Sequence, residues 1–209
     1  MATNKIKIDD VEFYEDPIAI ENKIWQMLDE AVNSRTSECR TPVFICGHKN
    51  QFDGRTVVLR AANQQGGFLQ FHADYRSSKI AIIQENEQGV FVFYDRRQKI
   101  QLRIKTKCQI NYKNKISHES WLKTQHISRK AYLTLSSPGS VLDKPGTGLT
   151  EKHENFLYSA EESELGFENF CVFRCNVQTI EWLFLSAKGH RRAKIDYEDT
   201  QNKFTWLTP

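Results

Sequence analysis

Two hairpin-like stretches constrain the fold of this chain more than any other feature of its sequence. RTVVLRAANQQGGFLQFHA (55–73) and GVFVFYDRRQKIQLRIKTKCQINY (89–112) each join two apolar, β-branched and aromatic segments through a short polar turn. Gly66 and Gly67 supply the permissive backbone that the first turn needs. Strands joined by such short turns must run antiparallel, because a parallel connection needs a crossover of a dozen or more residues. The pattern therefore predicts an antiparallel, mainly β fold, a Greek-key barrel or sandwich, and argues against a doubly wound parallel sheet.

The segment before these hairpins has a helical period instead. Asp16 can cap a helix whose first residue, Pro17, suits that position, and the helix is expected to cover about residues 16–33. Its apolar residues recur at helical spacing and form one stripe: Ile20, Ile24, Met27, Leu28 and Ala31. The stripe predicts a helix that packs on the core of the sheet.

The rest of the chain divides into a barrel and an insertion within one expected domain, residues 1–209. Strand patterns occupy about 41–112 and 170–209, and a Gly/Pro/Ser-rich loop with helices occupies about 113–169. One of these helices is expected to begin with Ser117 as its cap. The structure of residues 143–169 is not assigned from the sequence.

Composition excludes several classes of protein. The 29 Lys and Arg against 26 Asp and Glu give a net charge of +3, whereas a general nucleic-acid-binding protein needs a concentrated basic face. No apolar run approaches the ~20 residues that span a bilayer. The N-terminal stretch MATNKIKIDDVEFYED has no apolar signal core. Five cysteines, an odd number, are typical of a reducing compartment, so a cytoplasmic location is expected.

Cationic and hydroxyl side chains at the ends of the predicted strands are the candidate chemistry. RTVVLR has an arginine at each end, Arg55 and Arg60, and YRSSK brings Ser77, Ser78 and Lys79 to the start of a predicted short helix. Hydroxyls, a lysine and a helix N-terminus would suit a phosphate group. The alternative is that Ser77 only caps the helix and that the cations are solvated. The sequence contains no Ser-His-Asp signature, no phosphate-cradling Gly loop and no metal-ligand spacing, so no metal is expected and catalytic residues are not assigned.

Taken in order, these stretches resemble the pyridoxamine 5′-phosphate oxidase family and its FMN-binding relatives. RTVVLR resembles the family's Arg-x-Val-Leu-Leu-Lys strand, and GGFLQFHADYRSSKIAIIQENEQGVFVFYDRRQKIQLRI resembles the strands that follow it. The closing IEWLFLSAKGHRRAKIDY and WLTP resemble the family's C-terminal region. The resemblance covers about residues 40–140 and 170–209. It implies a six-stranded antiparallel split barrel, FMN as cofactor, and a homodimer that holds FMN at its interface.

Site residues carry over position by position. Lys79 matches the family's phosphate lysine, Ser78 replaces a neighbouring arginine, and Gln101 matches a glutamine that contacts the flavin. On a regular strand Arg55 and Arg60 point to opposite faces, so Arg55 is expected at the phosphate and Arg60 near the ring or the interface. The resemblance implies cofactor contacts for Arg55, Thr56, Val57, Val58, Arg60, His72, Ala73, Ser77, Ser78, Lys79, Gln101, Ser140 and Lys194.

The chain departs from the family on the substrate side. The family's Arg-Leu-His aligns with His190, Arg191 and Arg192, and Arg129 is the remaining stand-in for the residues that hold the substrate phosphate. His190, Arg192 and Arg129 are therefore the substrate-side candidates. The leading hypothesis is an FMN-dependent oxidoreductase with an unassigned small-molecule substrate. Alternatives are an authentic pyridoxamine/pyridoxine 5′-phosphate oxidase, a non-catalytic flavin-binding protein, and a barrel that binds nothing.

Overall fold

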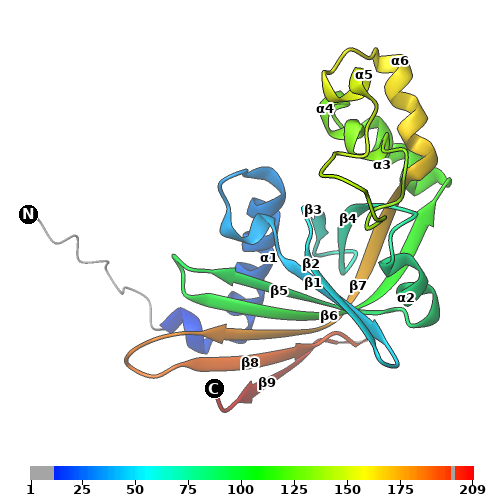
Figure 1. The fold of residues 1–209 in the computed structure, drawn as a ribbon. Helices are drawn as coiled ribbons and strands as arrows, with labels where there is room; N and C mark the ends of the chain where they lie inside the picture. The colour runs from blue at the N-terminus through cyan, green and yellow to red at the C-terminus, as the bar shows by residue number, and fades with distance from the viewer. Residues whose placement is uncertain (1–11, 199–200) are drawn as a thin grey trace, which may run out of the picture.

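The computed structural model describes residues 12–198 and 201–209, which form one antiparallel sheet with helices around it (Figure 1). Most of the N-terminal stretch inspected above for a signal lies outside the described residues. The strands are β1 (Val43–His48), β2 (Gln51–Thr56), β3 (Leu59–Asn63), β4 (Phe68–Asp74), β5 (Gln88–Asp95), β6 (Ile100–Tyr112), β7 (Phe170–Phe184), β8 (Arg191–Asp196) and β9 (Lys203–Leu207).

The sheet has the order β2-β1-β5-β6-β7-β4-β3, and β8 and β9 continue it from β7. The long strand β7 pairs with β6 along most of its length, with β4 over Phe170–Asn176, and with β8 over Thr179–Phe184. β7 thus gives its two halves to different neighbours, which splits the sheet. The fold prediction of an antiparallel barrel-like sheet with attached helices is confirmed, but the described residues contain nine strands instead of six, and the sheet does not close.

The stretch RTVVLR is not one strand. β2 ends at Thr56 and β3 begins at Leu59, so Val57 and Val58 form a link between the two edge strands of the sheet. The Val57 backbone N–H donates to the Pro42 carbonyl at 3.0 Å, and Val57 is buried. The expectation that Arg55 and Arg60 lie on one regular strand is wrong because the chain leaves one edge of the sheet and joins the other within two residues.

Helix α1 (Pro17–Asn33) follows the sequence prediction closely. The Asp16 carboxylate accepts hydrogen bonds from the backbone N–H groups of Ile18, at 2.9 Å, and Ala19, at 3.3 Å. The predicted stripe is buried, and α1 packs mainly against β3. Each fully buried aliphatic side chain contributes roughly 1.5–3 kcal/mol. The stripe therefore anchors α1 beside the Val57–Val58 link.

Aromatic side chains fill the centre of the core. Phe44, Phe71, Phe91 and Phe173 come from β1, β4, β5 and β7, and neighbouring ring centroids are 4.6–6.1 Å apart. On β6, Ile100, Leu102 and Ile104 are buried and alternate with more exposed residues. Tilted and stacked aromatic pairs add to the burial energy, so this layer holds the two halves of the sheet together.

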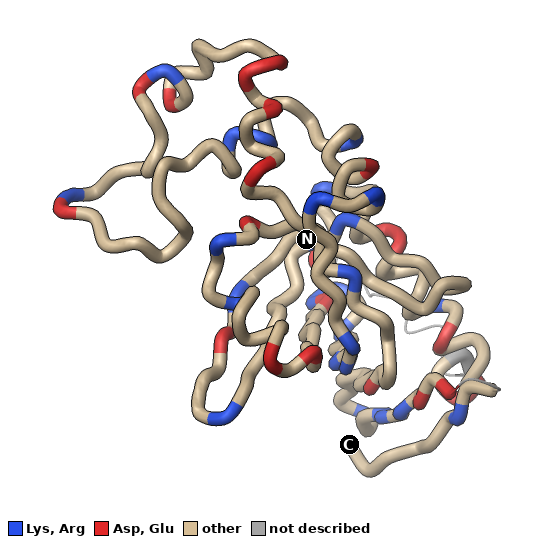
Figure 2. The backbone as a smooth tube through the Cα atoms, turned by 90° about the vertical axis from the view of Figure 1, so that its right-hand side faces the viewer, with Lys and Arg blue, Asp and Glu red and all other residues tan. Residues whose placement is uncertain are grey.

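Charged residues of both signs are mixed along the chain, as Figure 2 shows. Within the described residues, no helix has the length and apolar character needed to cross a membrane. All five cysteines are free and buried. Cys108 and Cys175 lie opposite each other on β6 and β7.

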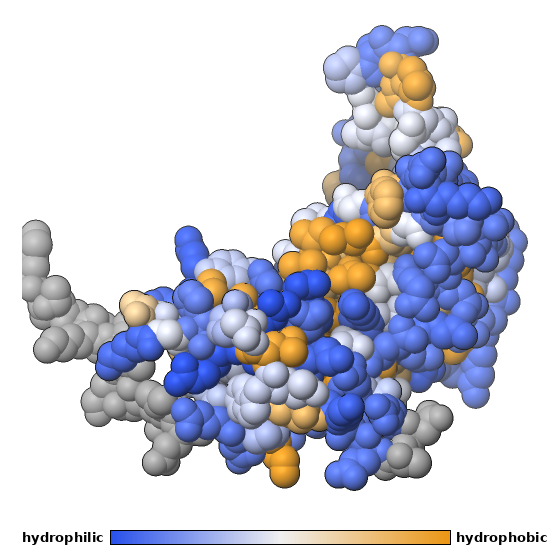
Figure 3. Space-filling model, turned by 90° about the horizontal axis from the view of Figure 1, so that it is seen from below, coloured by the Kyte–Doolittle hydropathy of each residue, from blue (hydrophilic) through white to orange (hydrophobic). Residues whose placement is uncertain are grey.

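One face of the sheet leaves apolar side chains exposed. On β1, Val43 and Ile45 are 38% and 36% exposed, and on β5 Tyr94 is 47% exposed. Val43 pairs with Val92 and Ile45 with Val90, so these side chains are neighbours across β1 and β5. Seen from below, the molecule shows a hydrophobic area bordered by hydrophilic residues (Figure 3).

Residues 113–169 form a helical lobe that stands off the sheet (Figure 1). In α3, Asn114 is the cap and Ser117 completes a capping box, so the prediction that Ser117 caps this helix is wrong by three residues. The remaining short helices are η1 (Glu12–Glu15), η2 (Glu38–Arg40), α2 (Lys79–Glu85), α3 (Lys115–Leu122), α4 (His126–Arg129), η3 (Lys130–Tyr132), α5 (Glu151–Glu154), α6 (Ala160–Ser163) and η4 (Glu164–Asn169).

Candidate functional site

The end of β2 meets the start of α2. We call the five residues at this junction the seat: Asp53, Arg55, Ser77, Ser78 and Lys79. The Arg55 guanidinium donates to the Asp53 carboxylate, with Nε at 3.0 Å from Oδ1, and its Nη2 lies 3.1 Å from Ser78 Oγ. Ser78 Oγ in turn donates to Asp53 at 3.1 Å. Asp53 and Arg55 are two residues apart, so they share one face of the strand. The fold therefore brings Arg55 and Ser78 together, 23 residues apart in sequence.

Lys79 is the buried cation of the seat. Its Nζ donates a hydrogen bond to Ser77 Oγ at 2.8 Å, and the residue is only 5% exposed to solvent. Burial first, and then the neighbouring Arg55, lower the pKa of Lys79. Among the described residues, Ser77 Oγ is the one acceptor within hydrogen-bond distance of this ammonium, which can donate three bonds. A buried ammonium with unused donors is suited to an anion.

Ser77 positions Lys79 and does not cap the helix. Its hydroxyl donates to the Asp74 carbonyl at 2.6 Å, and the residue that precedes α2, Ser78, makes no side-chain cap bond. Arg76 bonds both carboxylate oxygens of Asp74 and also reaches Thr134, with Nη1 3.0 Å from the Thr134 carbonyl. The turn before α2 is thus tied to the helical lobe, which keeps the seat rigid.

The side chains of the seat fit a phosphate group. Arg55 uses Nε and Nη2 for Asp53 and Ser78, and Nη1 has no partner among the described residues. Arg55 and Lys79 both keep donors without a partner among the described residues, and charge-assisted bonds to phosphate are stronger than neutral ones. Asp53 offsets part of this positive charge. The residues present therefore fit an FMN phosphate held by side chains, with α2 too short to add much.

Arg60 and His72 line a separate pocket on the other edge of the sheet. The pocket has a volume of about 420 Å³ and lies between the end of α1, strands β3 and β4, and the start of the lobe. Burial first, and then Arg60, lower the pKa of His72 to about 3, so the imidazole is neutral at physiological pH. Burial also lowers the pKa of Arg60. The structure thus places Arg55 and Arg60 in different surroundings, because the Val57–Val58 link carries the chain from one edge of the sheet to the other and not because they lie on opposite faces of one strand.

Gln101 and Lys194 belong to a third group, on the outer face of the sheet. Gln101 lies beside Tyr94 on β5 and Leu183 on β7, and Leu183 lies beside Arg192 on β8. Arg192 donates to Glu181 at 2.6 Å, and Lys194 pairs with Asp196 at 2.8 Å. This face is continuous with the exposed apolar side chains of β1 and β5.

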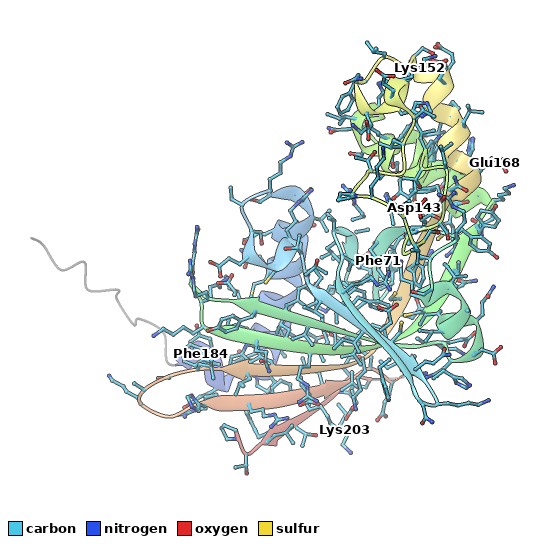
Figure 4. All side chains as sticks on the ribbon, viewed as in Figure 1. Phe71, Asp143, Lys152, Glu168, Phe184 and Lys203 are labelled. Atoms are coloured by element: carbon cyan, nitrogen blue, oxygen red, sulfur yellow. The ribbon has the colours of Figure 1, made fainter. Side chains whose placement is uncertain are left out.

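Several other candidates lie apart from these groups. Arg129 is buried in the helical lobe, where its guanidinium donates to the carbonyls of Trp121 and Thr124 and pairs with Glu164. Ser140 is exposed and bonds Ser137. Figure 4 shows how far the lobe, marked by Asp143 and Lys152, rises from the sheet that carries Phe184 and Lys203.

The remaining predicted positions surround the chain link or turns. Thr56 is exposed on β2, Val58 is half-buried, and the Ala73 carbonyl accepts the Cys171 thiol at 3.3 Å. His190 lies in the β7–β8 turn, where its Nδ1 accepts from the Ser186 backbone N–H at 3.0 Å. A binding role for each of these residues stays a prediction.

Sequence reasoning missed Asp53 and most of the pocket. Asp53 was detectable, because residues i and i+2 of a strand share a face and Arg55 was already a candidate. Arg35, Arg40 and Lys123 also line the pocket, but they come from the ends of helices with no shared motif. Only the tertiary fold places them together.

Comparison with known proteins agrees with this geometry. Residues 23–112 match the family model described as pyridoxamine 5′-phosphate oxidase, FMN-binding domain. No curated protein matches the chain at a significant level.

Two solved structures have the same fold. A pyridoxamine 5′-phosphate oxidase-related, FMN-binding protein from Nostoc punctiforme superposes with a TM-score of 0.73 at 17% identity, covering 90% of this chain and 96% of that one. PhzG from Burkholderia lata, solved with tetrahydrophenazine-1-carboxylic acid, gives a TM-score of 0.69 at 17% identity, covering 94% and 96%.

The match covers α1 from Lys23 onward, both hairpins and the seat. FMN, the cofactor expected from the sequence, is the ligand of the matched domain type. The resemblance seen in the sequence is therefore confirmed: residues 23–112 are similar to the FMN-binding domain of the pyridoxamine 5′-phosphate oxidase family, and the chain has the split-barrel fold of its structural relatives.

Proposed function

We propose that this protein is an FMN-dependent oxidoreductase related to pyridoxamine 5′-phosphate oxidase, with an unassigned small-molecule substrate. The observation that carries the proposal is the seat, in which a buried Lys79 with free donors lies beside Arg55 and Ser78. Bound FMN would supply the two-electron chemistry, and the protein supplies position and electrostatics. An enzyme of this kind needs no nucleophile or catalytic triad.

The side chains have distinct roles in this proposal. Arg55, Ser78 and Lys79 hold the phosphate, and Ser77 orients Lys79 through the 2.8 Å hydrogen bond. The Val57–Val58 link carries the chain from the seat to the pocket, where Arg60 and His72 lie. Because His72 is neutral, it can donate one hydrogen bond and accept another without adding charge.

We further propose that two copies of the chain form a homodimer through the outer face of the sheet. The exposed Val43, Ile45 and Tyr94 are the support, since adjacent exposed apolar side chains mark interaction surfaces. Gln101 lies on the same outer face of the sheet, so a flavin that it contacts would lie between the two subunits. A reducing compartment such as the cytoplasm suits the five free cysteines.

The test begins with the purified full-length protein. Its visible spectrum should show bound flavin, and mass spectrometry of the released cofactor should identify FMN. Anaerobic mixing with NADH, NADPH and dithionite, followed by oxygen or a quinone, should reduce and reoxidise the flavin through at least one physiological pair. Pyridoxamine 5′-phosphate should be oxidised slowly or not at all.

Three results would contradict the proposal. Protein that stays colourless and does not bind added FMN would contradict the assignment of FMN as the cofactor. Rapid turnover of pyridoxamine 5′-phosphate would establish the alternative oxidase. Tightly bound flavin that only dithionite reduces would favour a non-catalytic flavin-binding protein. For the dimer, light scattering should give twice the chain mass, and Ile45→Lys should give a monomer.

A further inference from the structure

A continuous chain of hydrogen bonds runs from the buried cation of the seat to the helical lobe. Lys79 Nζ donates to Ser77 Oγ at 2.8 Å, and Ser77 Oγ donates to the Asp74 carbonyl at 2.6 Å. Arg76 bonds the carboxylate of the same Asp74 and continues to Thr134. Each residue inside this chain is bonded to a neighbour on both sides, so a change at one end affects the bonds at the other.

Arg76 joins the two ends of this chain. Toward the seat, its Nε and Nη2 bond the two carboxylate oxygens of Asp74 at 3.0 and 2.7 Å. Toward the lobe, its Nη1 lies 3.0 Å from the Thr134 carbonyl oxygen and its Nη2 lies 2.8 Å from the Thr134 hydroxyl. A planar guanidinium fixes all these bonds in one geometry, which the ammonium of a lysine on its flexible stem does not.

The lobe end of the chain is an exposed segment, residues 134–149. Val141 within it is 94% exposed, and the segment is closed at its base by the bond from the Leu135 N–H to the Gly148 carbonyl, at 2.8 Å. Among the described residues, Arg76 makes the only hydrogen bonds that join this segment to the sheet or to its turns. The order of the segment therefore depends on how firmly Arg76 is held.

A second connection ties the same turn to the lobe and does not involve Arg76. The Tyr75 backbone N–H donates to the Asn169 carbonyl at 2.7 Å, and Asn169 Nδ2 donates to the Tyr132 carbonyl at 2.8 Å. These bonds end at the base of the lobe, before residues 134–149. They should keep the turn in place when Arg76 is replaced, so that a variant at this position changes the contact with the segment and not the path of the chain.

A phosphate bound at Lys79 would act on the seat end of the chain. The Lys79 ammonium can donate three bonds and has one partner among the described residues. An anion that takes the remaining donors would fix the ammonium, and with it the Ser77 hydroxyl that bonds Asp74. Hydrogen bonds in a chain strengthen one another when their surroundings exclude water. A ligand without a phosphate group would leave this end of the chain as it is.

We propose that Arg76 is a positioning residue that couples occupation of the phosphate position at Lys79 to the order of residues 134–149. The inference rests on the proposed function, since it takes the seat as the site of the FMN phosphate. A coupling between two sites is reciprocal. FMN should therefore order the segment, and weakening the contact between the segment and Arg76 should weaken FMN binding. Riboflavin, which has the same ring system and no phosphate, should show neither effect.

Hydrogen–deuterium exchange on the full-length protein tests the first effect. The wild type is compared without ligand, saturated with riboflavin and saturated with FMN. FMN should slow amide exchange in residues 134–149 by roughly fivefold or more beyond the effect of riboflavin, which is the lower end of the usual coupling between two sites. In Arg76→Lys, which keeps the charge and loses the planar geometry, this difference should disappear, while FMN still protects residues 77–85.

Binding affinities test the second effect. Arg76→Lys should weaken FMN binding by roughly threefold to tenfold and change riboflavin binding by less than about twofold. Thr134→Val removes one of the two acceptors and should cause a smaller loss of the same kind. The double variant should lose no more than Arg76→Lys alone, because both changes act through one contact. The matched control is Arg174→Lys, whose guanidinium lies 3.8 Å from the centre of the Phe68 ring and which should leave FMN affinity unchanged.

The outcomes separate this inference from the proposed function. If FMN binds but protects residues 134–149 equally in the wild type and in Arg76→Lys, or if riboflavin protects them as well as FMN does, the coupling is wrong while the flavin function stands. Equal losses of FMN and riboflavin affinity would show that Arg76 only supports the fold, which also overturns the coupling. If the wild type does not bind FMN, the proposed function fails and the coupling fails with it. Should Arg76→Lys not fold, Thr134→Val decides both measurements.

Discussion

The seat and the pocket are two cationic regions that one short link connects, and they handle their charges in opposite ways. In the seat, Arg55 pairs with Asp53 and Lys79 is buried against Ser77. In the pocket, Arg40 and Arg60 have no carboxylate partner among the described residues, and the two repel. A site whose cations are held by ion pairs and hydrogen bonds is ordered before a ligand binds, so it can keep one ligand permanently. A site whose cations have no carboxylate partner gains more electrostatic stabilisation when an anionic ligand enters.

This difference suits a cofactor on one side and an exchanging substrate on the other. Asp53 and the hydroxyls of the seat hold Arg55 and Lys79 in place, which lowers the entropy lost on binding. In the pocket, Arg35, Arg60 and Lys123 are exposed to solvent, which would allow a ligand to exchange. The following predictions test this contrast.

The largest effect is expected from the buried cation. Lys79→Ala should weaken FMN binding by about 10- to 100-fold, because a charge-assisted bond to phosphate contributes roughly 1.5–3 kcal/mol. Riboflavin lacks the phosphate, and its affinity should change much less. Titration of both ligands by flavin fluorescence measures the difference. Equal losses for the two ligands would show that Lys79 supports the fold and not the phosphate.

A second prediction concerns the pH dependence of stability. The pKa of His72 is about 3 in the folded state, against about 6.5 when unfolded. Between these values the unfolded chain binds more protons, so the contribution of His72 to stability is lost as the pH falls below about 6.5. The free energy of unfolding of the wild type should fall by on the order of 1 kcal/mol between pH 7 and pH 5 because of His72, and the His72→Gln variant should not show this fall.

Urea unfolding at pH 5, 6 and 7 measures this prediction. Arg60→Gln sharpens it, because Arg60 contributes to the low pKa of His72. With Arg60 replaced, the pKa should rise toward its ordinary value and the slope of stability against pH should flatten in part. Parallel slopes for the wild type and His72→Gln would mean that the imidazole titrates normally and that the pocket is open to water.

The sequence predicted the parts of this contrast that depend on local pattern. The helical stripe of α1, its Asp16 cap and the antiparallel hairpin at residues 89–112 follow from local pattern alone, and the structure has them. The family resemblance added the split barrel and FMN. Of the residues of the seat, Arg55, Ser77, Ser78 and Lys79 were named because RTVVLR and YRSSK are compact motifs, whereas Asp53 was missed.

Tertiary structure decided the rest. The break at Val57–Val58 could not be predicted, because two branched residues favour a strand and only the split of the sheet interrupts it. The pocket was missed because Arg35 and Arg40 lie near the ends of α1 and η2, whereas Lys123 follows α3 in a distant part of the sequence. Arg129 was named as the stand-in for the family's substrate-phosphate residues, but its guanidinium is occupied inside the helical lobe.

A third prediction concerns a substitution that weakens the ion pair within the seat. Asp53→Asn removes a negative charge next to the phosphate site and leaves an amide oxygen that can still accept from Arg55. FMN affinity should rise by about threefold to tenfold at low salt, since a nearby charge contributes up to roughly 1 kcal/mol at a partly exposed site. Stopped-flow release of FMN measures the change. A loss of affinity would show that Asp53 matters more for ordering Arg55 than for its charge.

The smallest effect is expected when a carboxylate is introduced beside the cations of the pocket. Ser128→Asp places a carboxylate in the lining of the pocket, among cations that have no ion pair within the described structure. It should stabilise the protein against urea by about 0.5 kcal/mol at low ionic strength, and added salt should reduce the gain. Ser78→Asp is the matched change in the seat, and it should destabilise the protein because Ser78 Oγ already donates to Asp53. Opposite signs for the two substitutions would confirm that one region is paired and the other is not. The same sign at both sites would mean that the pocket cations are fully compensated by solvent, and the contrast between the two regions would fail.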